Sequence, residues 1–256
     1  MMLMLMLNVD WYEILFQRHS FRRFQKRDLS DYEYNEMRKF SVTFKPFGEA
    51  ARVRVLPGGG EAVFKGSGSV KDARAYMAFI SGSQVTPLNL LRAGYSGEAA
   101  ILEAVRLGLD TCWIGAHFRS GKVAEQMGLD PGVKVYGVSP LGHGQPGMKN
   151  VSGHKRLEIE SLTVGTQQQE LWQASALEAA RLAPSDRNRQ PWRFVVGADS
   201  ILLRLDAAPK TRLDYWKYMD CGIVMLHLEL GALRAGKRGE WQYILKGCDA
   251  ARFVVL

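Results

Sequence analysis

The segment Ala183-Pro-Ser-Asp-Arg-Asn-Arg-Gln-Pro-Trp192 is the most informative stretch of this 256-residue chain. It joins a predicted helix to a predicted strand, Arg193–Val196. Its two prolines restrict the backbone, so the polar groups between them are held in place. Ser185, Asn188 and Gln190 offer both donors and acceptors, which suits the polar edge of a planar heterocycle. The alternative is a polar loop between a helix and a strand, anchored by its tryptophan.

A second candidate segment is Arg18-His-Ser-Phe-Arg22, which follows a short predicted helix over residues 10–17. Two arginines and a serine can hold a phosphate group, Arg through bidentate charge-assisted hydrogen bonds and Ser through its hydroxyl. His154-Lys-Arg156, in a glycine-rich loop, can add charge to the same group. Each segment read alone also fits a basic turn exposed to solvent.

A third candidate segment is Thr111-Cys-Trp-Ile-Gly115, which follows a helix predicted over residues 94–107. Small and apolar residues fill most positions of that helix, so we expect it to be buried nearly all round. Gly108 then ends it. Gly115 allows backbone to approach the face of a ring closely, although a Trp and an Ile after a buried helix are usually core residues.

The remaining elements of the first half follow from capping and strand signals. Ser30-Asp-Tyr-Glu33 has the pattern of a capping box, which predicts a helix of about ten residues after it. The sequence indicates strands at Arg52–Leu56, Ala75–Ile80 and Val133–Val138. Flexible glycine-rich backbone is expected at residues 58–60 and 66–69, and a loop over residues 140–156.

The second half begins near residue 163 and repeats this order. Ser175-Ala-Leu-Glu178 predicts another capping box, starting a helix over residues 176–183 that Pro184 ends. A further strand is expected at Ile201–Leu205 and a long buried helix over residues 218–234.

An internal repeat is indicated by an offset of 128 residues. At this offset Gly94 aligns with Gly222, Gly108 with Gly236, and Trp113 with Trp241. Since both halves mix helices with strands that cannot all belong to βαβ crossovers, the fold class is α+β, a sandwich. We expect one half over residues 8–160 and the other over 161–256.

Composition narrows the classes of function. The net charge of +8 is scattered along the chain, which argues against nucleic-acid binding and leaves a basic pocket for a phosphorylated cofactor open. Three widely spaced cysteines form no CxxC pair and suit a reducing cytoplasm. Apolar Met1–Leu7 lacks the features of a signal peptide, and no run of 18 apolar residues exists, so no membrane association is expected.

Familiar catalytic motifs are missing. The sequence contains no HExxH, no GxSxG, no GxGxxG and no P-loop, and its five histidines show no triad spacing. We therefore expect no metal site and no catalytic side chain. A protein that needs no acid–base pair is one whose cofactor carries the reaction.

At these residues the chain resembles the nitroreductase family of FMN enzymes. Arg18–Arg22 resembles the family's Arg-x-Ser-x-Arg/Lys phosphate motif, and Ala183–Trp192 its specific Pro-Ser-x-x-Asn-x-Gln-Pro-Trp loop. Gly108–Gly115 is similar to the segment that closes one side of the flavin, and His154–Arg156 to a late basic pair. Together these matches cover nearly the whole chain.

The order of the motifs departs from that of the ordinary family. The Pro-Ser loop normally follows the Arg motif closely, but here that place reads Val42-Thr-Phe-Lys-Pro-Phe47 and lacks the Ser and Asn. The second half has the loop without the Arg motif. Members are usually homodimers that hold each FMN with both subunits. The resemblance to a fused, pseudo-dimeric subgroup therefore implies one site, one lost twin site and a monomer.

The resemblance also implies the cofactors and their ligands. NADH or NADPH would reduce FMN, and a small electron-poor molecule, such as a nitro compound or quinone, would accept the electrons in a ping-pong reaction. Other flavin chemistry on the same fold, or flavin binding without turnover, remains an alternative. The expected cofactor-binding residues are Arg18, His19, Ser20, Arg22, Trp113, Ile114, Gly115, Lys155, Arg156, Pro184, Ser185 and Asn188.

Overall fold

The computed structural model describes residues 7–58, 60–64, 70–147, 155–165 and 170–256. The chain forms two compact units. Unit 1 comprises Met1–Phe16, Val85–Tyr95 and His154–Leu256, and unit 2 comprises Gln17–Gln84 and Ser96–Gly153. His154 and Gly66-Ser-Gly-Ser69, both named in the sequence predictions, lie outside the described residues.

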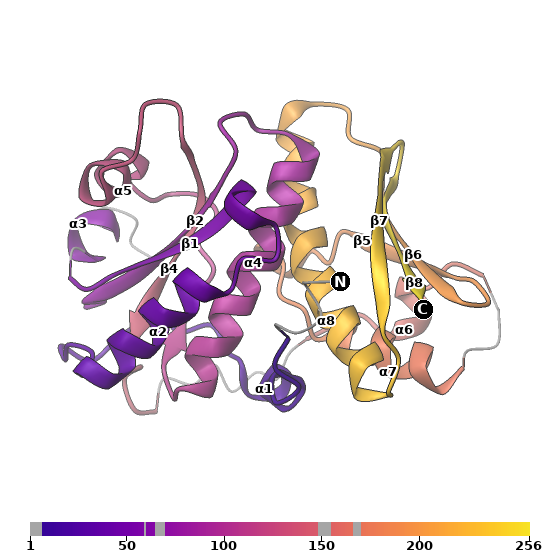
Figure 1. The fold of residues 1–256 in the computed structure, drawn as a ribbon, viewed down its shortest axis with the longest axis horizontal. Coiled ribbons are helices and arrows are strands. Elements are labelled where there is room, and N and C mark those ends of the chain that lie inside the picture. Colours follow the sequence, from indigo (N-terminus) through magenta and orange to yellow (C-terminus); the bar gives the residue numbers. More distant parts are fainter. Residues whose placement is uncertain (1–6, 59, 65–69, 148–154, 166–169) are drawn as a thin grey trace. The chain divides into compact units, whose positions relative to one another are not determined.

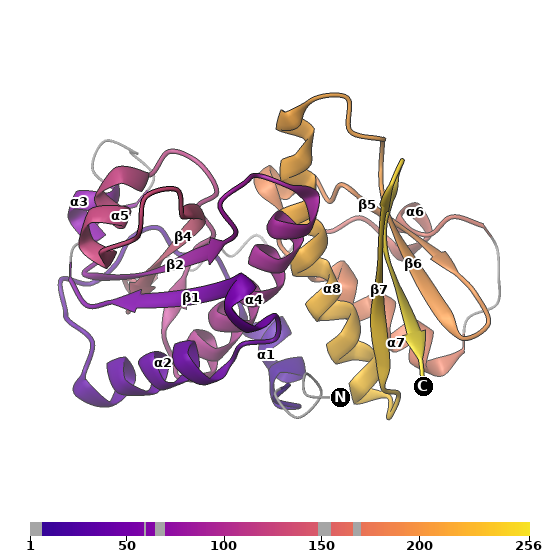
Figure 2. The same cartoon turned by 45° about the horizontal axis from the view of Figure 1, so that its top comes forward.

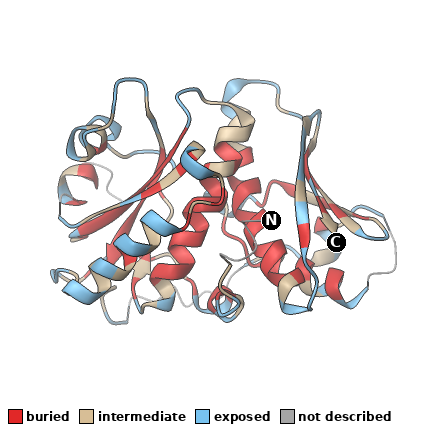
Figure 3. Ribbon diagram, viewed as in Figure 1, coloured by how far each residue is buried: buried red, intermediate tan, exposed pale blue. Residues whose placement is uncertain are grey.

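Unit 2 is built on a four-stranded antiparallel sheet of order β1-β2-β4-β3 (Figure 1). The strands are β1 (Ala51–Leu56), β2 (Ala75–Ser81), β3 (Asp110–Thr111) and β4 (Lys134–Gly142). Every residue of β2 is buried, because apolar side chains cover both faces of the sheet (Figure 3). Met77 and Phe79 belong to one core cluster, and Tyr76 and Ala78 to another, as the twofold alternation of a strand requires.

Helices of unit 2 contribute to each cluster. Met37 of α2 (Asp31–Thr43) and Ile101 of α4 (Pro87–Arg106) pack with Phe79. On the other face, residues of α3 (Gly60–Phe64) and α5 (Ser120–Met127) pack with Tyr76. The 3-10 turn η2 (Gly48–Ala50) precedes β1 in the chain. The sheet is thus the middle layer of three.

Unit 1 has a second four-stranded antiparallel sheet of order β5-β6-β8-β7, with the helices α7 and α8 beside it (Figure 2). The elements are α1 (Trp11–Gln17), α6 (Ile159–Leu162), α7 (Leu171–Arg181), η3 (Asp186–Asn188), β5 (Trp192–Val196), β6 (Ser200–Leu205), η4 (Arg212–Trp216), α8 (Lys217–Arg234), β7 (Gly239–Lys246) and β8 (Asp249–Val255). In β5 and β6 buried residues alternate with more exposed ones, so one face forms the core.

The internal repeat predicted from the sequence is confirmed by topology. Both sheets place their strands in the same order relative to the chain. Gly108 and Gly236 both follow the long helix of their half with a positive φ, 79° and 76°. The indole of Trp113 donates to a buried glutamate on α4, and the indole of Trp241 to one on α8, at 2.6 and 2.9 Å. The fold is therefore α+β with two diverged repeats.

The start of α4 crosses α8 within unit 1 at a very close approach. A Cβ atom at Gly94 would overlap the carbonyl oxygen of Met219, and one at Gly222 would overlap that of Leu91. These two contacts are related by the same 128-residue offset. Only glycine lets two helix backbones approach this closely, so the paired glycines fix the crossing.

One helix start was predicted wrongly. Helix α7 begins at Leu171 rather than residue 176, and its capping box is formed by Glu170 and Gln173. Ser175 lies inside the helix and donates to the Gly231 carbonyl at 2.8 Å. A Ser-x-x-Glu pattern also occurs within helices, where residues three apart share a face. The pattern alone could not locate the helix start.

Other boundaries differ more modestly. The capping box of Ser30 and Glu33 is confirmed. Helix α4 starts at Pro87 rather than residue 94, because proline suits the first helical position and Thr86 accepts from the Asn89 amide. Strand β4 continues to Gly142, into the expected loop, since it pairs with both β2 and β3. Part of the expected glycine-rich flexible stretch forms α3.

Substitution of either crossing glycine tests this packing. Gly222→Ala should lower the free energy of unfolding by roughly 1–3 kcal/mol, because the helices must separate. Gly121→Ala is the control, since its new Cβ would meet no atom within 4 Å, and it should be neutral or stabilising by up to about 1 kcal/mol. Urea denaturation followed by circular dichroism measures both. Equal stabilities of the two variants would refute the close crossing.

Candidate functional site

In unit 2 the Arg motif runs beside β3. The amide of Phe21 donates to the Thr111 carbonyl at 2.8 Å, and Ser20 pairs with Thr111 in a parallel bridge. This pairing places two sequence-predicted segments, Arg18–Arg22 and Thr111–Gly115, next to each other. The two segments are far apart in the sequence, and each was predicted independently of the other.

Arg18 is the most unusual charged residue of this cluster. Its side chain is only 3% exposed, and its nearest counter-charge, Glu98 Oε1, lies 3.9 Å from its Nε. Among the described residues, the Nε atom has no hydrogen-bond partner. Burial lowers the pKa of the guanidinium, and the charge of Glu98 opposes that shift. A buried cation with incomplete compensation is costly, and a bound anion would supply the missing partner.

The thiol of Cys112 shows which side chains surround this point. Burial raises its pKa, while the charge of Arg22, a hydrogen bond from Ser20 and the charge of Arg18 oppose the rise. The three motif side chains therefore gather at one position, where β3 ends. The buried hydroxyl of Thr111 also lacks a hydrogen-bond partner in the part of the chain that the structure describes. Two unpartnered polar atoms thus lie in the same small region.

His19 lies between the motif residues and is partly exposed. Its Nδ1 lies 2.7 Å from the Gln17 carbonyl oxygen, so one ring nitrogen is taken up by local structure.

The residues after β3 divide between core and surface. The Trp113 ring packs on Phe79 with centroids 4.4 Å apart, and its indole donates to Glu98. Ile114 is buried and exchanges backbone hydrogen bonds with Val138 at 2.9 and 3.0 Å. Gly115 is exposed. Of these three sequence-predicted residues, only Gly115 presents open backbone to a ligand.

In unit 1 the Pro-Ser loop is short, strained and tightly bonded. Arg187, Asn188 and Gln190 all have positive φ, 49°, 57° and 50°, which is uncommon for residues other than glycine. The Gln190 amide donates to Ser185 Oγ at 2.8 Å, and Pro184 is buried. Strained backbone of this kind persists only where surrounding contacts enforce it, as they commonly do at functional sites.

The basic turn contacts this loop directly. Arg156 donates to the Asn188 side-chain oxygen and to the Leu182 carbonyl, and Asn188 donates to the Lys155 carbonyl at 2.6 Å. The side chains of Arg156 and Asn188 therefore hold each other. Lys155 is exposed, with its ammonium free to reach a ligand. The structure thus brings together four more sequence-predicted residues: Lys155, Arg156, Ser185 and Asn188.

Asp220 supports the same loop from the first turn of α8. It is 8% exposed, and its Oδ1 accepts the Asp186 amide at 3.1 Å. Burial raises its pKa to about 8, with a smaller contribution from the charge of Asp186 and opposition from the amide bond and Arg189. This carboxyl is therefore mostly neutral near pH 7.

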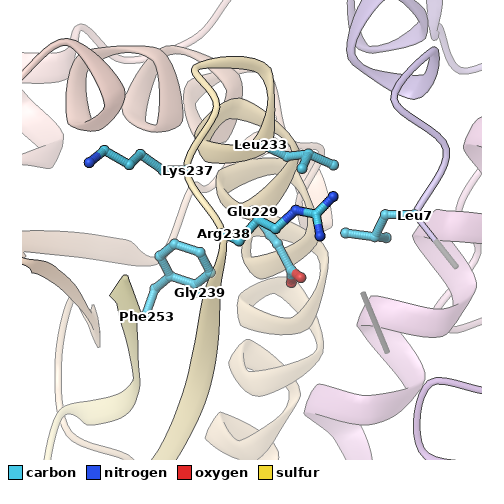
Figure 4. Close-up of a pocket in the computed structure, with 7 residues that line it drawn as sticks. All are labelled: Leu7, Glu229, Leu233, Lys237, Arg238, Gly239 and Phe253. Atoms are coloured by element: carbon cyan, nitrogen blue, oxygen red, sulfur yellow. The ribbon is translucent and has the colours of Figure 1, made fainter. Parts of the chain in front are cut away.

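A separate small hollow lies in unit 1 between α8 and β7, beside Glu229 (Figure 4). Tyr95 and Trp241 both donate to Glu229 Oε2 at 2.9 Å, and burial raises the pKa of this carboxyl to about 7. The empty space is about 250 Å³, part of it open solvent. That is below the usual range for ligand pockets, so this hollow is not a flavin cavity.

Neither a metal cluster nor a membrane span is found where the chain is described. Within the described ranges, no group of three or more His, Cys, Asp or Glu side chains could hold a metal ion. Among the same residues, no helix is sufficiently long and apolar to cross a bilayer.

The sequence reasoning missed the buried carboxyls of Glu98 and Asp220 and, within the third candidate segment, the part played by the Thr111 hydroxyl. Glu98 and Thr111 contact the Arg motif, and Asp220 contacts the Pro-Ser loop. A charged residue within a helix predicted to be buried all round is a signal that could have identified Glu98 and Asp220. No sequence signal distinguishes the Thr111 hydroxyl from a surface threonine.

Comparison with known families identifies the chain. The family model described as "Putative TM nitroreductase" matches residues 10–232. The chain belongs to this nitroreductase family. It is therefore an oxidoreductase, and the resemblance of the chain to the family is confirmed.

One solved structure shares the fold. A structure described as that of a "putative nitroreductase" from Thermotoga maritima is 20% identical, with a TM-score of 0.67, and the match covers 97% of this chain and 94% of the other. A nitroreductase family protein from Clostridium difficile 630 is 16% identical, covering 62% and 98% with a TM-score of 0.49. An FMN-dependent nitroreductase from Clostridium difficile R20291 is 16% identical, covering 61% and 98% with a TM-score of 0.48. No protein of curated function matches the chain in sequence.

Proposed function

We propose that this nitroreductase-family protein binds one FMN per chain and transfers electrons from NADH or NADPH to small electron-poor molecules such as nitro compounds or quinones. The observation that carries the proposal is Arg18, a buried guanidinium with an unpartnered Nε beside Ser20. A phosphate monoester is a dianion with several acceptor oxygens, so it would supply the compensation that Glu98 gives only weakly at 3.9 Å. The residues present fit FMN.

The phosphate end of the cofactor belongs to the Arg motif. Arg18 and Ser20 would bind the phosphate oxygens, with the Thr111 hydroxyl available as a further donor. Arg22 is exposed at the same strand end, where its charge favours an anionic ligand. Gly115 would place backbone against the ring.

The family motifs assign the Pro-Ser loop, in unit 1, to the ribityl and ring end of FMN. Ser185 and the turn that Asn188 anchors would bond the ribityl chain or flavin edge, and Lys155 would add charge toward the phosphate. Since Arg156 and Asn188 already bond each other, they act by fixing the turn and the loop together. FMN itself supplies the hydride and electron chemistry when bound. No side chain is needed as a proton donor at the reacting atom.

The same proposal covers the organisation of the protein. Each half, residues 8–160 and 161–256, supplies what the other lacks, so a homodimer is unnecessary and the enzyme would act as a monomer. The three cysteines are free thiols, which suits a reducing compartment, and we place the enzyme in the cytoplasm.

Absorbance tests the reaction directly. The purified protein, reconstituted with FMN, should show flavin absorbance that NADH or NADPH bleaches without oxygen. Addition of a quinone or nitroarene should then restore the colour. Anaerobic stopped-flow spectroscopy with both nicotinamides and a panel of acceptors measures each half-reaction. A colourless protein that takes up no FMN would contradict the proposal. A protein that binds FMN but whose flavin is reduced by neither NADH nor NADPH would contradict the proposed reaction and support flavin binding without this turnover.

Arg18→Ala tests the phosphate contact. FMN affinity should fall by roughly 10- to 100-fold, because a charge-assisted contact in a buried position is lost. Arg54→Ala, on the exposed end of β1, is the matched control and should change affinity less than twofold. Quenching of flavin fluorescence measures the dissociation constant, and circular dichroism verifies folding. Similar affinities of the two folded variants would exclude Arg18 from the site.

A further inference from the structure

Asp220 occupies a position that the family motifs do not include. It lies in the first turn of α8 and is almost fully buried, and within the described part of the chain its carboxyl accepts a hydrogen bond from the amide of Asp186. Asp186 begins the strained part of the Pro-Ser loop, immediately before the positive-φ residues Arg187 and Asn188. A single buried carboxyl thus holds the point where the loop turns.

We propose that Asp220 is a positioning residue whose proton keeps the Pro-Ser loop in its closed, bonded conformation. The inference rests on the proposed function in one respect, that this loop contacts FMN. The physical basis is the cost of charge in this environment. A neutral carboxyl can accept the Asp186 amide at little cost, but an ionised one at 8% exposure needs either water or a cation.

The surrounding charges determine what ionisation would do. On the loop, Asp186 raises the pKa of Asp220 and Arg189 lowers it. On α8, Cys221 is a buried neighbour, and Lys217 is already paired with Asp206 of the β6–η4 connection at 2.7 Å. Of the described cations, Arg189 is therefore the one that acts on Asp220 and can approach it once it is ionised.

Movement of Arg189 toward Asp220 would disturb the loop on both sides. Arg189 is 61% exposed and only loosely paired with Asp186, at 3.8 Å. Its neighbours Asn188 and Gln190 have positive φ and carry the hydrogen bonds to Lys155, Leu157 and Ser185. Drawing Arg189 inward therefore strains the contacts that shape the loop. The loop should loosen as pH rises through the titration of Asp220, near pH 8.

Trypsin digestion measures the loop conformation without any cofactor. Trypsin cleaves after arginine, and Arg187 and Arg189 are exposed and lie next to Asp186, where Asp220 contacts the loop. Cleavage after these two residues, identified by mass spectrometry and normalised to a reporter peptide at each pH, should rise roughly tenfold from pH 7 to 9.5. Asp220→Asn keeps an oxygen that accepts the Asp186 amide and cannot ionise. It should stay within about twofold across this range.

Glu229→Gln is the matched control. Glu229 is a second buried carboxyl on the same helix with a raised pKa, about 7, but it bonds Tyr95 and Trp241 rather than the loop. This variant should retain the pH dependence of the wild type. Asp220→Ala, which removes the acceptor, should be cleaved rapidly at every pH. Thermal unfolding by circular dichroism confirms that each variant is folded.

Parallel FMN titrations separate this inference from the proposed function. The FMN dissociation constant of the wild type should weaken roughly tenfold between pH 7 and 9.5, and that of Asp220→Asn should remain flat. Identical pH profiles of wild type and Asp220→Asn in the trypsin assay would overturn the role of Asp220. Absence of FMN binding in all variants would overturn the proposed function, while the trypsin profiles would still decide whether Asp220 holds the loop.

Discussion

The account depends on the burial of the Arg18 guanidinium. A cation that is 3% exposed, with Glu98 3.9 Å away and an Nε without a partner, is retained only if something compensates the cost of desolvation. The backbone pairing of the Arg motif with β3 holds it there, together with Ser20 and Arg22. A phosphate group would supply the compensation that Glu98 gives only weakly, which is why we propose that the first half of the chain binds the phosphate of FMN.

The two repeats have diverged around corresponding residues, which fits the proposal of a single site. Both repeats keep the strand order, the positive-φ glycine after the long helix, and an indole bonded to a buried glutamate. They differ in what surrounds that glutamate. In the first repeat Glu98 faces Arg18, whereas in the second Glu229 is bonded to Tyr95 beside a small hollow. The fold has been conserved between the halves, and the ligand groups have diverged.

Much of the fold was predictable because local signals agree with tertiary structure. The Ser30–Glu33 capping box, Gly108 and the β1 and β2 strands follow from residue types that have few alternatives. Three strands escaped prediction: β3 has only two residues, β7 is largely exposed, and β8 lacks a regular alternation of buried and exposed residues. The pairing of Ser20 with Thr111 and the support of the Pro-Ser loop by Asp220 depend on contacts between distant segments, which no local pattern encodes.

The stoichiometry of bound flavin tests the central claim most directly. The protein is saturated with FMN, freed of excess ligand by gel filtration with light scattering, and analysed for released flavin and for protein by amino-acid analysis. One FMN per monomeric chain is predicted, because the Arg motif and the Pro-Ser loop each occur once. Two FMN molecules per chain, or one shared between two chains, would contradict the account.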